Sequence, residues 1–262
     1  MLEINKIYCG DNIDYFKLID DNSIDCIITD PPYIIDTNAG GEVEYIGASK
    51  RASKIKNTSK KYWEKKGFED KARYNIEGMK NGFDVDYYLN EFERMLKMVN
   101  MFIFCSNKQI SSLMRWGEER GYITTLLCWV KTNSTPFANG VWRSDVEFIV
   151  HIRQKGAIFN GDAELKKKAF ISPSVISKYN HPTEKPIDLI KKFVLIGTNE
   201  NNLILDPFIG SGTTAEVAIN LNRNFIGIEI DECYYKIACK RIEMAKGNVG
   251  LFSREIERVL LS

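Results

Sequence analysis

Glycines and acidic residues near the end of the chain have the spacing of a nucleoside-binding site. The motif Asp206-Pro207-Phe208-Ile209-Gly210-Ser211-Gly212-Thr213-Thr214 directly follows the apolar run 202–205, and the next apolar run ends at Glu229. Glycines let the backbone approach a ligand at the carboxyl end of a strand, and an acid after the next strand can bind both hydroxyls of a ribose. Ala215 replaces the third glycine of a dinucleotide-binding motif, so the predicted cofactor contains a nucleoside but need not be a dinucleotide.

A second motif, Asp30-Pro31-Pro32-Tyr33, follows the apolar run 24–29. Two consecutive prolines lack amide hydrogens and keep the backbone extended, which leaves carbonyl acceptors beside a carboxylate and an aromatic ring. Asp30 and the Pro31 carbonyl could therefore accept both N–H bonds of an amino group on a flat ring, while Tyr33 stacks on that ring. The simpler alternative is a turn at a strand end with Asp30 as a capping residue.

Together, the two motifs resemble those of the amino-methylating DNA methyltransferases that use S-adenosylmethionine. The motif at 30–33 precedes the motif at 206–212, which is the circularly permuted order of their β class. Three further stretches extend the resemblance, and they are Gly10-Asp11-Asn12, Trp129-Val130-Lys131 with Asn133, and His181-Pro182-Thr183-Glu184-Lys185-Pro186. Motifs that match jointly and in order are far more specific than any one of them.

The resemblance implies a role for each matched residue. The target base is flipped out of the duplex, and the predicted catalytic residues that receive it are Asp30, Pro31, Pro32 and Tyr33. The residues expected to bind S-adenosylmethionine are Asp11, Asn12, Asp30, His181, Thr183, Lys185, Asp206, Pro207, Phe208, Gly210, Ser211, Gly212, Thr213 and Glu229. Among them, His181 and Lys185 are expected near the methionine carboxylate, and Lys131 and Asn133 are expected beside the target base and the DNA.

The identity of the acceptor stays open at this point. In the family, aspartate at the position of Asp30 mostly accompanies adenine N6 and serine accompanies cytosine N4, so we predict adenine, with cytosine N4 as the nearest alternative. An RNA or protein amino methyltransferase is less favoured, because the glutamine-modifying enzymes carry asparagine before Pro-Pro-Tyr. A nicotinamide-dependent dehydrogenase would share the glycines and Glu229 but would leave the motif at Asp30 unexplained.

Alternating strands and helices must position these motifs. The pattern predicts an α/β fold with a doubly wound, mostly parallel, seven-stranded sheet, the Rossmann-like methyltransferase fold. The predicted strands are Lys6–Cys9, Ile24–Thr29, Met101–Cys105, Thr124–Lys131, Val146–Ile152, Asn202–Leu205 and Phe225–Glu229. The predicted helices are Asn12–Leu18, Val85–Met98, Lys108–Arg120, Pro186–Gly197, Thr213–Asn220 and Glu232–Ala245.

Two inserts interrupt the alternation in what we predict to be a single methyltransferase domain over 1–262. The insert 34–82 is basic, since residues 50–80 hold eleven Lys/Arg and four Asp/Glu, and it is predicted to contact DNA. The predicted phosphate contacts are Lys60, Lys61, Lys65 and Lys66. The insert 154–180 is the candidate for target recognition. An ordinary solvated loop is the alternative for the basic insert.

Composition bounds the remaining possibilities. The chain has 262 residues, a net charge of +1 and 44% hydrophobic residues, the balance of a globular protein. The sequence has no signal-peptide pattern and no apolar run near the ~18 residues of a membrane span, so we expect a cytoplasmic protein without a membrane partner. Six cysteines without CxxC spacing and only two histidines argue against a metal site. The expected partner is double-stranded DNA, and the resemblance also allows a homodimer and a cognate restriction endonuclease.

Overall fold

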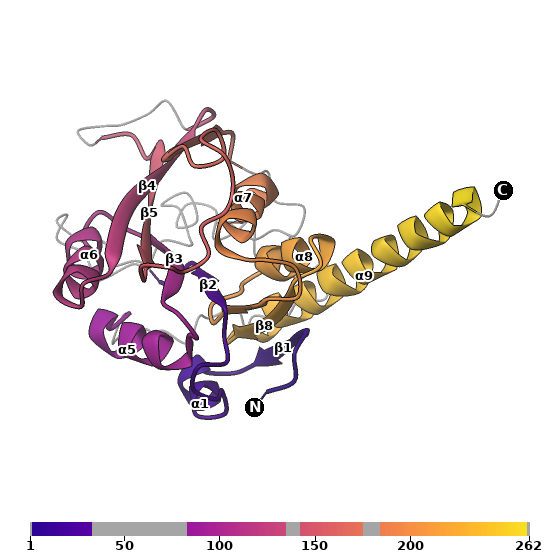
Figure 1. Cartoon of the computed structure of the whole chain (residues 1–262), viewed down its shortest axis with the longest axis horizontal. Helices are drawn as coiled ribbons and strands as arrows, with labels where there is room; N and C mark the ends of the chain where they lie inside the picture. The colour runs from indigo at the N-terminus through magenta and orange to yellow at the C-terminus, as the bar shows by residue number, and fades with distance from the viewer. Residues whose placement is uncertain (1, 33–82, 135–141, 175–183, 261–262) are drawn as a thin grey trace, which may run out of the picture.

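A single eight-stranded sheet forms the centre of the molecule in the computed structural model, which describes residues 2–32, 83–134, 142–174 and 184–260 (Figure 1). The strands are β1 (Lys6–Cys9), β2 (Cys26–Thr29), β3 (Asn100–Cys105), β4 (Ile123–Lys131), β5 (Val146–Arg153), β6 (Ala169–Ser172), β7 (Leu203–Asp206) and β8 (Asn224–Glu229). Their spatial order is β1-β8-β7-β2-β3-β5-β4-β6. Neighbouring strands are parallel except where β5 pairs antiparallel with β3 and β4.

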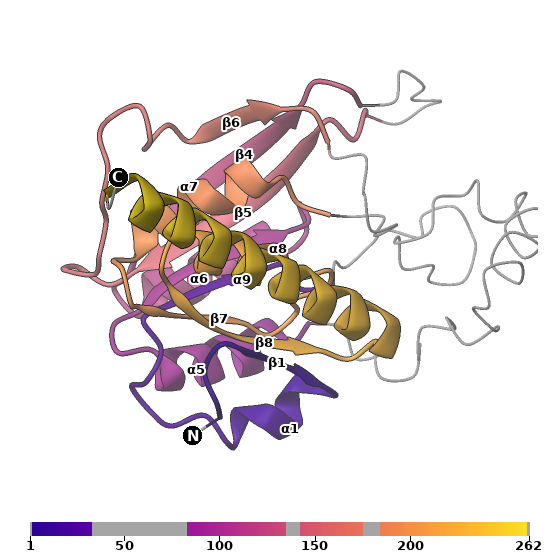
Figure 2. The same cartoon turned by 90° about the vertical axis from the view of Figure 1, so that its right-hand side faces the viewer.

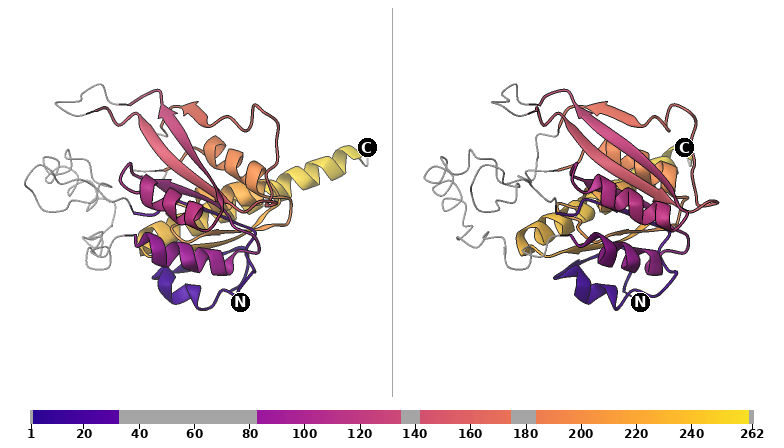
Figure 3. Two further views of the ribbon diagram at one scale, coloured as in Figure 1. Left: turned by 60° about the vertical axis from the view of Figure 1, so that its left-hand side comes forward. Right: turned by 90° about the vertical axis from the view of Figure 1, so that its left-hand side faces the viewer.

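Helices cover both faces of this sheet, as the doubly wound prediction requires (Figures 2 and 3). The helices are α1 (Asn12–Phe16), α5 (Val85–Met95), α6 (Ile110–Glu119), α7 (Ile187–Gly197), α8 (Thr213–Asn220) and α9 (Glu232–Leu260). One hydrophobic core lies beneath α1, α5 and α6, and the other lies beneath α7, α8 and α9.

The strand sequences explain why both faces are buried. In β3, Met101 and Ile103 pack into the first core, while Phe102 and Phe104 pack into the second. Successive side chains of a strand point to opposite faces, so a strand between two helical layers must be apolar at every position. All six residues of β3 are buried accordingly.

The number of strands differs from the prediction. Seven of the observed strands match predicted ones, whereas β6 lies inside the insert 154–180, for which no strand was predicted. This strand is short, and its burial pattern alternates between exposed and half-buried. It was missed because a short strand at a sheet edge lacks the continuous apolar run that marked the others.

Helix ends also differ from the prediction. Helix α5 ends at Met95 rather than Met98, and α9 continues beyond Ala245 to Leu260. The last part of α9 extends away from the rest of the described chain (Figure 1).

The topology selects one place for a ligand. From β2 the chain continues to β3 on one side, and from β7 it continues to β8 on the other, while β2 and β7 are neighbours. The strand order therefore reverses between β2 and β7. In open α/β sheets, ligands bind at the carboxyl ends of the strands beside such a reversal.

Candidate active site

The predicted site residues that the structure describes meet at the carboxyl edge of the sheet. Because β2, β7 and β8 are parallel, Asp30, Asp206 and Glu229 lie at the ends of neighbouring strands. At the edge of the sheet, Cys9 pairs with Glu229, so the turn at Asp11 follows at the same level. Four segments of the chain therefore converge at this edge.

Asp206 connects the end of β2 to the glycine loop and to α8 through hydrogen bonds. It is buried and accepts hydrogen bonds from Thr29 Oγ1 at 2.9 Å, Thr214 Oγ1 at 2.7 Å and the Phe208 amide at 3.2 Å. Burial raises the pKa of Asp206 to about 6, even though the hydrogen bonds from Thr214 and Thr29 favour the carboxylate. Asp206 thus fixes the start of the glycine loop to the end of β2.

The glycine loop has a backbone that only glycine adopts easily. Gly210 and Gly212 have φ angles of 54° and 88°, in the left-handed region. A Cβ atom on Gly212 would approach Ala238 Cβ of α9 to 3.0 Å. A side chain there would strain the loop and displace the helix, so Gly212 is required for this close packing.

Glu229 closes the other side of the loop. Its Oε2 accepts from the Gly210 amide at 2.8 Å, and its Oε1 accepts from the Asp231 amide at 2.8 Å. Burial raises the pKa of Glu229 to about 7, against the effect of these two hydrogen bonds. A carboxylate offers about four acceptor positions, so it can also bind ribose hydroxyls. The loop and the acid therefore fit the nucleoside part of S-adenosylmethionine.

The turn after β1 contacts the start of the glycine loop through Asn12. Asp11 caps α1 by accepting from the Ile13 amide at 3.0 Å. Asn12 is buried and donates to the Pro207 carbonyl at 3.0 Å, and Tyr88 donates to Asn12 at 3.0 Å. The Phe208 ring lies 5.4 Å from the Tyr88 ring, centroid to centroid. Sequence reasoning missed Tyr88, which carries no motif and is identified only by its contacts.

At the end of β2, Asp30 is bound by a lysine. Lys185 Nζ hydrogen-bonds Asp30 Oδ2 and lies 3.2 Å from Glu147 Oε2. Glu147 Oε1 in turn lies 2.6 Å from Lys131 Nζ. Sequence reasoning placed Lys185 at the cofactor and did not single out Glu147. That contact with the cofactor stays a prediction, and the observed partners of Lys185 include two carboxylates.

The motif after Asp30 is held from the neighbouring segment. Pro31 is buried, and the Pro32 carbonyl accepts from Gln109 Nε2 at 3.3 Å. Gln109 itself is buried and accepts from the Ser106 amide at 3.0 Å. This second contact fixes the amide of Gln109 that supports the proline turn.

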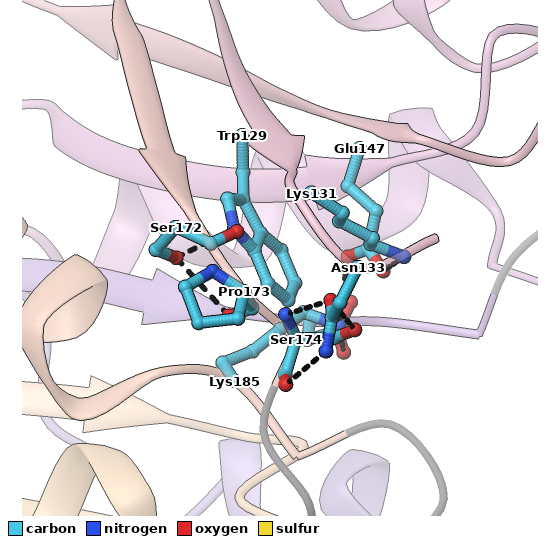
Figure 4. Close-up of polar contacts among 9 residues, drawn as sticks. Trp129, Lys131, Asn133, Glu147, Ser172, Pro173, Ser174 and Lys185 are labelled. Atoms are coloured by element: carbon cyan, nitrogen blue, oxygen red, sulfur yellow. Dashed lines mark hydrogen bonds and ion pairs between the residues drawn. The ribbon is translucent and has the colours of Figure 1, made fainter. Parts of the chain in front are cut away.

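The end of β4, with Trp129 and Asn133, is hydrogen-bonded to β6 and the residues that follow it (Figure 4). The Trp129 ring is buried, and its Nε1 donates to Ser172 Oγ at 2.9 Å. Asn133 Oδ1 accepts from the Ser174 amide at 2.7 Å, and Asn133 Nδ2 donates to the Ser174 carbonyl at 3.1 Å. The insert 154–180 therefore reaches the carboxyl edge through β6.

Some predicted residues lie outside the described part of the chain. They are Tyr33, the insert 34–82 with Lys60, Lys61, Lys65 and Lys66, and the residues His181 and Thr183. Among the described residues, no group of His, Cys, Asp or Glu could hold a metal ion. None of the described helices combines the length and apolarity that a bilayer span requires.

The fold and this edge define a Rossmann-like transferase with a site for a nucleoside-containing cofactor. The protein family described as DNA methylase, whose members act on N6 or N4 amino groups, matches residues 24–240. The chain belongs to this family. It is a DNA methyltransferase that uses S-adenosylmethionine, as the motifs predicted.

Individual relatives extend the match over nearly the whole chain. The Type II methyltransferase M2.LlaDCHI of Lactococcus lactis subsp. cremoris is 31% identical over 87% of this chain and 87% of its own length. The DNA adenine methyltransferase YhdJ of Escherichia coli (strain K12) is 28% identical over 93% of this chain and 84% of its own. The crystal structure of the M1.HpyAVI–SAM complex superposes with a TM-score of 0.62 at 28% identity, covering 90% and 98% of the two chains.

Proposed function

We propose that the chain methylates the N6 amino group of adenine at a specific DNA site. The observation that carries this proposal is Asp30, bound by Lys185 at the end of β2 and beside the glycine loop that follows β7. A carboxylate at this point can accept a hydrogen bond from an exocyclic amino group. The aspartate residue type and the adenine methyltransferase among the relatives support adenine over cytosine.

In the proposed mechanism, S-adenosylmethionine supplies the methyl group from its sulfonium centre. Asp30 and the Pro31 carbonyl accept the two N–H bonds of the amino group, so that the nitrogen lone pair points toward the methyl carbon. The nitrogen would bond to this carbon as the carbon–sulfur bond breaks and the sulfur leaves as a neutral thioether, and one N–H proton would then pass by way of the Asp30 carboxylate to water. Because the nitrogen becomes positively charged, the carboxylate of Asp30 stabilises the transition state. Tyr33 is assigned to stacking on the flipped base.

The cofactor contacts form part of the same proposal. Glu229 binds the ribose hydroxyls, Asp11 lies at the adenine of the cofactor, and the loop 207–213 surrounds the nucleoside. The geometry that supports this assignment is the positive φ of Gly210 and Gly212 beside the buried carboxylate of Glu229.

The single domain over 1–262, the DNA contacts and the assembly also remain proposals. We assign phosphate contacts to the basic insert 34–82 and target recognition to the insert 154–180, which the bonds of Ser172 and Ser174 support. The "Type II" name of M2.LlaDCHI is consistent with an accompanying restriction endonuclease. A homodimer and a cytoplasmic location complete the proposal.

Expression in a host without DNA methylation, followed by single-molecule sequencing of its DNA, tests the proposal. We expect N6-methyladenine at one short recurring sequence, and no modification from the variant Asp30→Ala. N4-methylcytosine would instead establish the cytosine alternative. Unmodified DNA from a folded, cofactor-binding protein would contradict DNA as the substrate.

The phosphate contacts have their own test. On duplex DNA, the slope of log affinity against log salt decreases by about 0.9 for each phosphate group that the protein no longer neutralises. Replacing Lys60, Lys61, Lys65 and Lys66 by alanine should therefore weaken binding to all sequences and flatten this slope, without changing the preferred site. An unchanged slope would mean that the basic insert is a solvated loop.

A further inference from the structure

Four alternating charges form a chain that ends at Asp30. Lys131 binds Glu147, Glu147 lies against Lys185, and Lys185 binds Asp30. Figure 4 shows Lys131, Glu147 and Lys185 gathered at the same edge of the sheet. Three of these residues lie at strand ends, and Lys185 precedes α7.

The sheet topology explains why an acid from β5 reaches this edge. Strand β5 runs antiparallel to β3 and β4, so its first residues lie beside the last residues of those strands. Phe148 pairs with Cys105 at the end of β3, and Glu147 pairs with Trp129 near the end of β4. The antiparallel strand β5 thereby brings a carboxylate to the end of the sheet where the parallel strands terminate.

The energetics indicate that Glu147 and Lys185 depend on each other. The Lys185 side chain is only 7% exposed. Burial opposes its charge, but Asp30 and Glu147 outweigh this effect, and the pKa of Lys185 is raised. Burial likewise opposes the charge of Glu147, but Lys185 and Lys131 outweigh it and lower the pKa of Glu147. A buried charge without its partner is strongly unfavourable, so Lys185 needs both carboxylates.

We propose that Glu147 is a positioning residue of methyl transfer, acting through Lys185 on Asp30. Glu147 holds the ammonium of Lys185 at a fixed point, and Lys185 holds Oδ2 of Asp30. The orientation of the carboxylate then directs Oδ1 to the amino group of the base. This inference rests on the proposed role of Asp30 and adds a residue that touches neither the base nor the cofactor.

Charge balance gives Glu147 a second effect on the same step. Alone with Asp30, Lys185 would neutralise the carboxylate that must stabilise a developing positive charge. Sharing Lys185 between two carboxylates draws part of its positive charge away from Asp30. Loss of Glu147 should therefore slow the methyl-transfer step and leave the binding of the cofactor unchanged.

Glu147→Gln tests the proposal, because glutamine keeps the shape of the side chain and removes the charge. Assayed on the DNA site that sequencing identifies, with DNA and cofactor saturating, kcat should fall roughly 10- to 100-fold, since small misplacements near the reacting atoms have effects of this size. The Kd for S-adenosylmethionine, measured by calorimetry, should stay within about twofold. A residue that acts only through the fold would not produce this split between kcat and cofactor affinity.

Asp25→Asn is the matched control. Asp25 is 14% exposed and Glu147 is 17% exposed, and each pairs with a lysine, but Asp25 lies at the opposite end of β2 from Asp30. The kcat of the Asp25→Asn variant should equal that of the wild type. If Glu147→Gln does not fold, Glu147→Asp keeps the negative charge and moves it back by one methylene group. It should show a smaller loss of kcat at unchanged cofactor affinity.

The outcomes separate this inference from the proposed function. A wild-type protein that transfers no methyl group to DNA would contradict the proposed function itself. If the wild type is active and the folded Glu147 variants keep its kcat, or lose cofactor affinity as much as kcat, the positioning role is wrong.

Discussion

Two pairs of carboxylates lie at the same edge of the sheet, and the protein treats them in opposite ways. Asp206 and Glu229, on the cofactor side, accept hydrogen bonds from hydroxyls and backbone amides. Asp30 and Glu147, on the catalytic side, are bound by lysines. Burial raises the pKa of Asp206 to about 6 and that of Glu229 to about 7, whereas the lysines lower the pKa of Glu147.

The difference matches the chemistry assigned to each side. A ribose hydroxyl is neutral and donates a hydrogen bond, so its partner needs acceptor lone pairs but no cation beside it. An amino group that accepts a methyl cation becomes positive, so its partner must carry charge when the reaction occurs. On the cofactor side, neutral hydroxyl and amide donors are sufficient to hold the carboxylates in place. On the catalytic side, lysine ammonium groups keep the carboxylates ionised.

The largest expected effect is a loss of turnover when a carboxylate of the catalytic side is removed. Asp30→Ala should lower kcat roughly 10³- to 10⁴-fold, because it removes the acceptor of the amino group. Cofactor binding by calorimetry should remain close to that of the wild type, since the contact operates in the transition state. Turnover near the wild-type value would contradict the role of Asp30.

The next effect concerns stability. Lys185→Met leaves Asp30 and Glu147 close together without the ammonium between them, and loss of one member of a buried ion pair typically destabilises a protein by about 3–5 kcal/mol. Denaturant unfolding measures this change. The control Lys97→Met removes a lysine that is 51% exposed and paired with Asp25, so about 0–1 kcal/mol is expected there. Equal losses in the two variants would show that the charge chain has no special importance.

The sequence predicted the cofactor side more completely than the catalytic side. Asp206, the glycines and Glu229 lie within one strand–helix–strand unit, so their spacing in the sequence reflects their spacing in the structure. Their partners are mostly local, as the bond from Thr214 to Asp206 illustrates. The geometry of such a motif can therefore be predicted from the sequence spacing of its residues.

The catalytic side depends on residues distant in the sequence. Lys185 is 155 positions from Asp30. Glu147 belongs to no motif, and its place follows from the antiparallel direction of β5, which apolar patterning does not encode. The strand β6 was missed for a related reason, since its pairing with β4 decides its structure and its own sequence gives little signal.

A smaller effect is expected on the cofactor side. Glu229→Ala should weaken S-adenosylmethionine binding by roughly 1.5–3 kcal/mol, the usual contribution of hydrogen bonds to a charged group. Titration calorimetry measures it, and Glu232→Ala, which removes an exposed acid paired with Lys236, should leave the affinity unchanged. Equal affinities for wild type and Glu229→Ala would mean that the cofactor lies elsewhere.

The smallest expected effect is a pH dependence of S-adenosylmethionine binding that arises from Glu229. The pKa of Glu229 is about 7 in the cofactor-free protein, so about a tenth of the molecules carry the carboxylate at pH 6 and about nine tenths at pH 8. Ribose hydroxyls donate to the carboxylate, so binding favours the ionised form and lowers its pKa. Affinity should therefore fall as the pH decreases through 7, by roughly five- to tenfold between pH 8 and pH 6.

Calorimetry at several pH values separates this group from other titrating groups. Glu229→Gln cannot ionise at this position, yet it retains Asp206 and any titration of the cofactor itself. The pH dependence of the wild type minus that of Glu229→Gln should show a single transition near pH 7. Parallel curves for the two proteins would contradict this prediction, because they would mean that the ionisation of Glu229 is not coupled to cofactor binding between pH 6 and pH 8.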